Sequence, residues 1–143
     1  MARERKWCNW RGGAMIEFAL VLPVFIILVF GIIEFSILFY NKAVITNASR
    51  EGARYGIIER VPTYATSSQI IAYTKERCED QLITFGASAA EPVVTATPSA
   101  NPPDTGDLLT VEVSYLYTYL VMSSLLNINQ TVNLSATTVM AYE

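Results

Sequence analysis

The sequence has no histidine among its 143 residues, and this absence excludes several kinds of site. Ser-His-Asp and Cys-His nucleophile pairs need an imidazole, and so do His-ligated zinc sites and imidazole pH switches. The chain has two cysteines, Cys8 and Cys78, in segments of very different character. They provide neither a disulfide framework nor a Cys-x-x-Cys cluster. The chain also lacks a phosphate-binding glycine loop, so we expect no enzyme activity and no metal or other cofactor.

Charged residues are scarce, at 16% of the chain, and hydrophobic residues make up 52%. An average soluble domain has about 25% charged residues, so this composition excludes a disordered chain and leaves room for a membrane segment. The net charge of −3 gives no general attraction to nucleic acid. The charges are also unevenly placed, because residues 1–13 hold four basic residues and one acidic residue, whereas the chain from Asn41 onward holds six basic and ten acidic ones.

The segment Phe18–Ile33 reads FALVLPVFIILVFGII and contains no charge, and the apolar run resumes after Glu34 as far as Tyr40. A helix of roughly 20 apolar residues crosses the hydrocarbon core of a bilayer. We therefore predict a single membrane-spanning helix over about residues 18–40. The basic N-terminus favours a cytoplasmic start, although basic residues also follow the span. The run is too long for a signal peptide and no small-x-small cleavage site follows it.

Two glutamates interrupt the apolar sequence. Glu34 lies about 25 Å beyond Glu17 in a helix, which places it near the far interface. One interpretation is a carboxylate that reaches water or is protonated near the headgroups, and the other is an intramembrane contact with another subunit. The residues alone leave both open.

Glu17 stands at the other end of the apolar run, just after Gly12 and Gly13. An unpaired carboxylate is costly to bury, so Glu17 requires a cation. Proteolysis between Gly12 and Gly13 would create an α-amine four residues before Glu17, and that amine could neutralise it. The simpler alternative is a flexible Gly-Gly hinge, with Glu17 as a first-turn partner of the helix dipole.

The stretch Gly12–Phe18 (GGAMIEF) and the apolar run after it resemble the N-terminus of TadE-like proteins of the tight-adherence pilus system. The segment Ala43–Tyr55 (AVITNASREGARY) resembles the signature that follows the membrane helix in that family. The tail, with VEVSYLYTYL and NLSATTVMAYE, is similar in kind. It departs at Met140-Ala141, where family members often have a basic residue after the methionine.

This resemblance implies a bacterial minor pilin or pseudopilin of a type IVc-like adhesive pilus. A prepilin peptidase would cut between Gly12 and Gly13 on the cytoplasmic face, and Glu17 would be the assembly glutamate at mature position five. The implied partners are the peptidase, other pilin or pseudopilin subunits, the membrane platform and the lipid bilayer. The implied location is the inner membrane, with an extracytoplasmic head, or the pilus and cell surface. The alternative is an untrimmed single-pass accessory or adhesin-like protein.

The helix is expected to continue past the membrane to Val61, because Pro62 is a natural stop. Glu51 and Arg54 are spaced to pair along this helix. A glycine inside a helix is unfavourable by about 1 kcal/mol relative to alanine, so Gly52 indicates close packing. Arg50, Glu51, Gly52 and Arg54 are therefore candidates for helix packing or a subunit contact, and a solvated charged face is the alternative for the three charged residues.

After the long helix, Ser67 or Ser68 can cap a second helix that runs to about Phe85. The inner stripe of this helix is expected to consist of Ile70, Ile71, Thr74, Cys78, Leu82 and Phe85. Val93–Thr97, Leu109–Tyr119 and Thr131–Tyr142 alternate like strands of an antiparallel sheet, and the tyrosine row of the middle strand is expected to pack rather than bind. We thus predict an α+β chain of lollipop shape. Its parts are a basic leader over residues 1–12, a long helix over 13–61 and a small head over 62–143.

Overall fold

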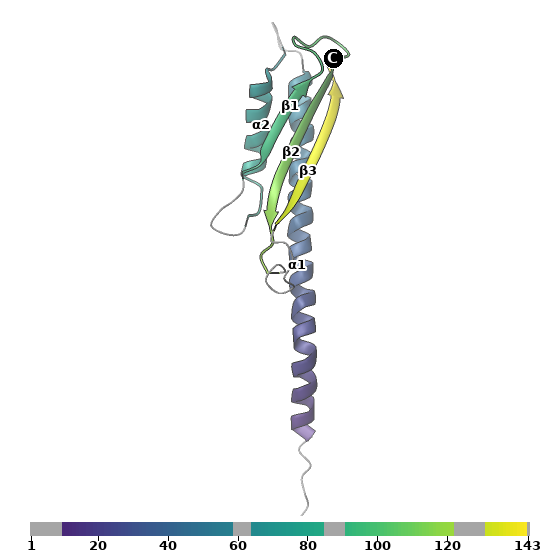
Figure 1. Cartoon of the computed structure of the whole chain (residues 1–143), viewed down its shortest axis with the longest axis vertical. Helices are drawn as coiled ribbons and strands as arrows, with labels where there is room; N and C mark the ends of the chain where they lie inside the picture. Colours follow the sequence, from purple (N-terminus) through teal and green to yellow (C-terminus); the bar gives the residue numbers. More distant parts are fainter. Residues whose placement is uncertain (1–9, 59–63, 85–90, 122–130, 143) are drawn as a thin grey trace, which may run out of the picture.

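The computed structural model describes residues 10–58, 64–84, 91–121 and 131–142. It consists of a long helix α1 (Trp10–Ile57), a short helix α2 (Ser67–Glu79) and the strands β1 (Val93–Pro98), β2 (Leu108–Thr118) and β3 (Thr131–Ala141). The three strands form one antiparallel sheet in the order β1-β2-β3. The predicted α+β fold with a long N-terminal helix and a small head is confirmed (Figure 1).

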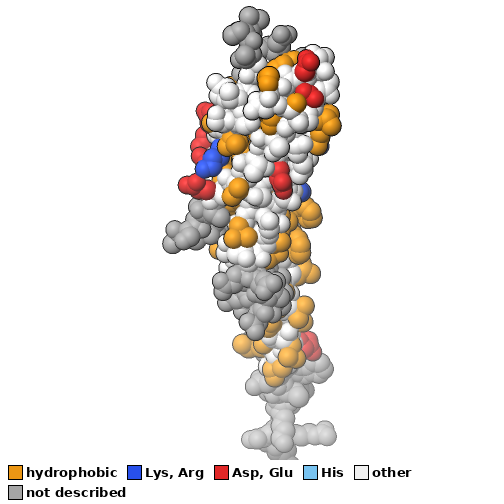
Figure 2. Space-filling model, turned by 45° about the horizontal axis from the view of Figure 1, so that its top comes forward, with side chains coloured by type: hydrophobic (Ala, Val, Ile, Leu, Met, Phe, Trp, Pro, Cys, Tyr) orange, Lys and Arg blue, Asp and Glu red, His pale blue; other side chains and the backbone are white. Residues whose placement is uncertain are grey.

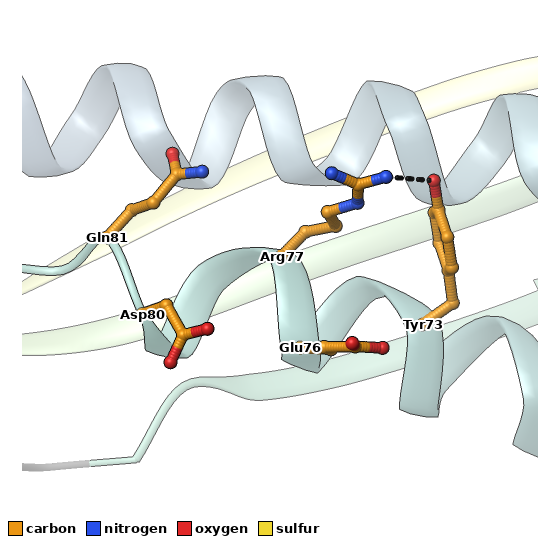
Figure 3. A pocket seen from close by; sticks show the side chains of 5 residues that line it. All are labelled: Tyr73, Glu76, Arg77, Asp80 and Gln81. Atoms are coloured by element: carbon orange, nitrogen blue, oxygen red, sulfur yellow. Dashed lines mark hydrogen bonds between the residues drawn. The ribbon is translucent and has the colours of Figure 1, made fainter.

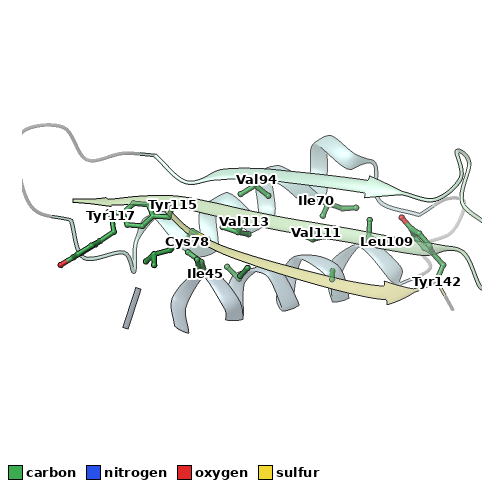
Figure 4. Close-up of a cluster of buried hydrophobic side chains, with 14 residues drawn as sticks. Ile45, Ile70, Cys78, Val94, Leu109, Val111, Val113, Tyr115, Tyr117 and Tyr142 are labelled. Atoms are coloured by element: carbon green, nitrogen blue, oxygen red, sulfur yellow. The ribbon is translucent and has the colours of Figure 1, made fainter. Parts of the chain in front are cut away.

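The sheet packs one face against α1 and α2, because alternate residues of each strand are apolar. In β2 the buried positions are Leu109, Val111, Val113, Tyr115 and Tyr117. They meet Ile45 of α1 and Ile70 and Cys78 of α2 in one core (Figure 4). The tyrosines Tyr115 and Tyr117 are 2% and 1% exposed, so the tyrosine row packs inward as predicted.

Helix α2 lies antiparallel to α1 and begins at a capping box. Thr66 is the N-cap, its side chain accepts from the Gln69 amide, and the Gln69 side chain accepts from the Thr66 amide. The predicted start at Ser67 or Ser68 is one or two residues late as a cap, since the T-x-x-Q pattern begins at Thr66.

The predicted end of α2 at Phe85 is wrong, because the helix ends at Glu79. The side-chain amide of Asn41 on α1 donates to the Ile83 carbonyl at 2.8 Å and accepts from the Ile83 amide at 2.9 Å. This pair of hydrogen bonds holds the chain after α2 in a non-helical conformation. Phe85 itself lies outside the described residues, as do residues 59–61 at the predicted end of α1.

Candidate functional site

The lower half of α1 carries an exposed apolar surface that the head does not cover. Most large apolar side chains between Met15 and Ile33 are 37–73% exposed, and Ile27 and Val29 are partly exposed. Within the described residues, α1 is the one helix long and apolar enough to cross a membrane. On the face seen in Figure 2, apolar side chains line the visible part of α1 below the head. Because such a surface is unfavourable in water, α1 is a single-pass membrane anchor.

The predicted cleavage pair lies at the start of this anchor. Gly12 and Gly13 are helical and exposed, and a Cβ at either position would meet nothing within 4 Å. Glu17 lies one turn further along, is also exposed, and forms no hydrogen bond or ion pair with the described residues. Among the side chains that the structure describes, none places a cation beside Glu17. The first turn of α1 holds no acidic residue, so Glu17 is not the first-turn residue of the hinge alternative.

Glu34 is buried at the junction between the bare helix and the head, with 4% exposure. Its Oε1 accepts a hydrogen bond from the Leu120 amide, and its Oε2 accepts from the Val121 amide at 3.4 Å. Both amides directly follow β2. Neither interpretation of the sequence included this contact with the chain's own head, because it joins residues 86 positions apart.

In the middle of α1, Glu51 and Gly52 are two of the residues that face α2. A Cβ on Gly52 would lie 2.1 Å from the Thr74 hydroxyl oxygen, so this glycine allows α1 and α2 to approach closely. Glu51 pairs with Arg77 of α2 at 3.3 Å. Its predicted pairing with Arg54 along α1 is wrong, because α2 offers the nearer cation.

Arg50 and Arg54 lie on the opposite side of α1 and are exposed. Neither forms a hydrogen bond or an ion pair with any residue that the structure describes. Of the four candidates, Gly52 therefore packs inside the head, Glu51 pairs with α2 at the surface, and Arg50 and Arg54 face outward.

Around Arg77, α2 carries a polar cluster that the sequence did not indicate. The Arg77 guanidinium donates to the Tyr73 hydroxyl at 3.1 Å, and Tyr73 stacks on Tyr55 of α1 with ring centroids 4.3 Å apart. Tyr73 and Arg77 line a hollow of about 300 Å³ together with Glu76, Asp80 and Gln81 (Figure 3). The spacing of Glu76 and Asp80 by one helical turn was the available signal for an acidic face here.

Burial sets the chemistry of the two reactive side chains in the core. It raises the pKa of the Cys78 thiol to about 11, so this cysteine is protonated and inert at neutral pH, as expected of a small buried hydrophobe. Burial, with the neighbouring Glu34 carboxylate, raises the pKa of Tyr117 to about 12. The Tyr117 hydroxyl has no hydrogen-bond partner among the described residues.

The family model of TadE-like proteins matches residues 12–54, which confirms the resemblance found in the sequence. The matched segment runs from the cleavage pair through the bare helix to Arg54. No curated protein and no solved structure matches the chain.

Proposed function

We propose that this chain, whose residues 12–54 match the family model of TadE-like proteins, has a structural role in the tight-adherence pilus as a minor pilin or pseudopilin. A prepilin peptidase removes residues 1–12 on the cytoplasmic face. The trimmed chain is then assembled through its apolar N-terminal helix, among like helices and beside the membrane platform. The head acts on the extracytoplasmic side as a contact surface and not as an enzyme.

The observation that carries this proposal is the combination of the family match with the exposed apolar half of α1. The match covers both the bare helix and the part of α1 on which the head is built. A helix that is bare over one half and covered over the other can stay in a bilayer or pack among similar helices without unfolding its head. The open surroundings of Gly12 and Gly13 also support access by a protease.

The role of Glu17 follows from the same geometry. The carboxylate is exposed on an apolar helix that must enter lipid or a bundle, where an unpaired charge is costly. Cleavage at Gly12 creates an α-amine at Gly13, and this amine of the same or a neighbouring chain provides the missing cation. Glu17 is then the assembly glutamate.

Mass spectrometry of the membrane-extracted chain tests the trimming. We expect an N-terminus at Gly13 when a cognate prepilin peptidase is present and the full N-terminus when it is absent. Gly12→Leu is expected to block trimming, and because a side chain at residue 12 meets open space, this variant still folds.

The alternative function is an untrimmed membrane-anchored accessory or adhesin-like protein. If assembled, functional fibres retained residues 1–12, the trimmed-pilin proposal would be overturned and the untrimmed alternative would be favoured.

A further inference from the structure

The outward side of α1 above the bilayer forms a continuous exposed face that the head leaves uncovered. We call this the back face, and it consists of Phe39, Ala43, Asn47, Arg50 and Arg54. These residues recur at steps of three or four, so they form one stripe along the helix. Phe39 is 66% exposed, and the two arginines lack ion-pair partners among the described residues. The back face thus combines an apolar lower end with two free positive charges above it.

The arginines of this face are too far from the membrane to serve lipid headgroups. Exposed apolar side chains continue on α1 as far as Tyr40, and Arg50 lies 10 residues later, about 15 Å further along α1. The headgroup layer is only about 5–8 Å thick on each side. A protein surface is therefore the partner that fits.

The same chain carries a complementary surface on α2. In the hollow beside Arg77, Glu76 and Asp80 form no ion pair with the described residues, and Arg77 itself is engaged by Glu51 and Tyr73. The side chains of Glu76 and Asp80 project from the same side of α2, one turn apart (Figure 3). The hollow therefore has a net negative charge and room for a guanidinium group.

The two surfaces lie at the same height above the membrane. Gly52 faces Thr74 and Gly56 faces Ile70 across the antiparallel pair of helices. By this register Arg50 is level with Glu76, and Asp80 lies about 6 Å nearer the membrane. Because the apolar segment fixes every copy at one depth, surfaces of two neighbouring copies meet only when their heights agree.

We propose that the back face of one copy binds the α2 hollow of a second copy, with Arg50 inserted between Glu76 and Asp80 and Arg54 adding to the attraction. The two surfaces point in different directions from α1, so the contact is head-to-tail and can continue from copy to copy. All copies keep α1 parallel, as a shared membrane requires. This inference extends the proposed function by naming a contact between heads, and it does not depend on trimming.

Disulfide cross-linking of the full chain in lipid vesicles tests the contact. One population carries Asn47→Cys, a second population with a different tag carries Gln81→Cys, and both carry Cys8→Ser so that leader thiols cannot cross-link. We expect a cross-linked heterodimer on mild oxidation. Arg50→Glu with Arg54→Glu in the first population is expected to lower its yield about tenfold, because like charges then face each other. Glu76→Lys with Asp80→Lys in the second population is expected to restore the yield.

The matched control is Glu112→Lys, which makes the same kind of charge change on the exposed face of β2. It is expected to leave the yield unchanged. No heterodimer in the unsubstituted pair, a yield insensitive to Arg50→Glu, or a failed restoration would each overturn the contact. Mass spectrometry of the same samples reports trimming separately, so failure of this contact is distinguishable from failure of the pilin proposal.

Discussion

Gly52 sets the distance between the two helices of the head. Thr74, which faces it, is fully buried, and its hydroxyl donates to the Ile70 carbonyl at 2.7 Å. A methyl group at residue 52 would lie 2.1 Å from that hydroxyl oxygen and 3.1 Å from the Thr74 Cβ. Thr74 cannot turn away without losing its hydrogen bond. The cost of a glycine within a helix is therefore offset by the close contact that it permits.

We expect Gly52→Ala to destabilise the head by about 2 kcal/mol, because overpacking outweighs the better helix propensity of alanine. Thermal unfolding of the full chain in detergent, followed by near-ultraviolet circular dichroism, measures this effect. Gly13→Ala is the matched control, since it adds the same methyl group to α1 in open space. If both variants unfolded at the wild-type temperature, the close packing at Gly52 would be disproved.

Among the secondary-structure elements, regular periodicity gave the reliable predictions. The alternation in β2 and β3 predicted their inward faces, because a strand that covers a core on one side repeats every two residues. The stripe of Ile70, Thr74 and Cys78 likewise predicted the buried face of α2. These features are local, so the sequence contains them directly.

Contacts between distant residues were not predictable in the same way. The end of α2 depends on Asn41, which lies 42 residues before Ile83. Glu51 selects Arg77 over Arg54 only because α2 folds against α1. The family resemblance marked Glu51 and Arg54 without distinguishing the inward residue from the outward one. Glu51 faces α2 and Arg54 faces outward because of where the head packs on α1, and this position cannot be predicted from a single sequence.

The end of β2 is attached to α1 through Glu34. Replacing this carboxylate by alanine leaves the partly buried amides of Leu120 and Val121 without their acceptor, and the loss of such a hydrogen bond costs about 1 kcal/mol. We expect Glu34→Ala to accelerate hydrogen exchange at these two amides by about tenfold or more. Glu34→Gln, which retains one acceptor oxygen, should give an intermediate rate.

Hydrogen exchange of the full chain in micelles, read by nuclear magnetic resonance, measures these rates. Ser36→Ala is the control, because the Ser36 hydroxyl bonds only to the Ile32 carbonyl of its own helix. Equal exchange at Leu120 and Val121 in the wild type and in Glu34→Ala would contradict an anchoring role for the carboxylate.

At the scale of the whole molecule, Glu34 divides the bare half of α1 from the half that bears the head. The bare apolar side chains run from Met15 to Ile33, about 27 Å of helix, close to the roughly 30 Å of a bilayer core. The sequence placed the span at about residues 18–40. Exposed apolar side chains also occur beyond Ile33, at Phe35, Phe39 and Tyr40, so the span over residues 18–40 stays a prediction.

This division requires the leader and the head to lie on opposite sides of the membrane, and thiol labelling can test which side each occupies. In the Gly12→Leu background the leader and its Cys8 remain attached, and Thr95→Cys adds a thiol on the exposed face of β1. We expect a membrane-impermeant maleimide to label the cysteine at residue 95 in intact spheroplasts, and Cys8 only after lysis.

Cys78 serves as an internal control, because it is fully buried and its pKa is raised to about 11, so it should react only after unfolding. Labelling of Cys8 in intact spheroplasts would reverse the proposed orientation. The leader would then lie outside the cytoplasm, whereas the proposed peptidase cuts on the cytoplasmic face. Trimming between Gly12 and Gly13 would be impossible. Orientation is thus the property of the whole chain on which the proposed processing depends.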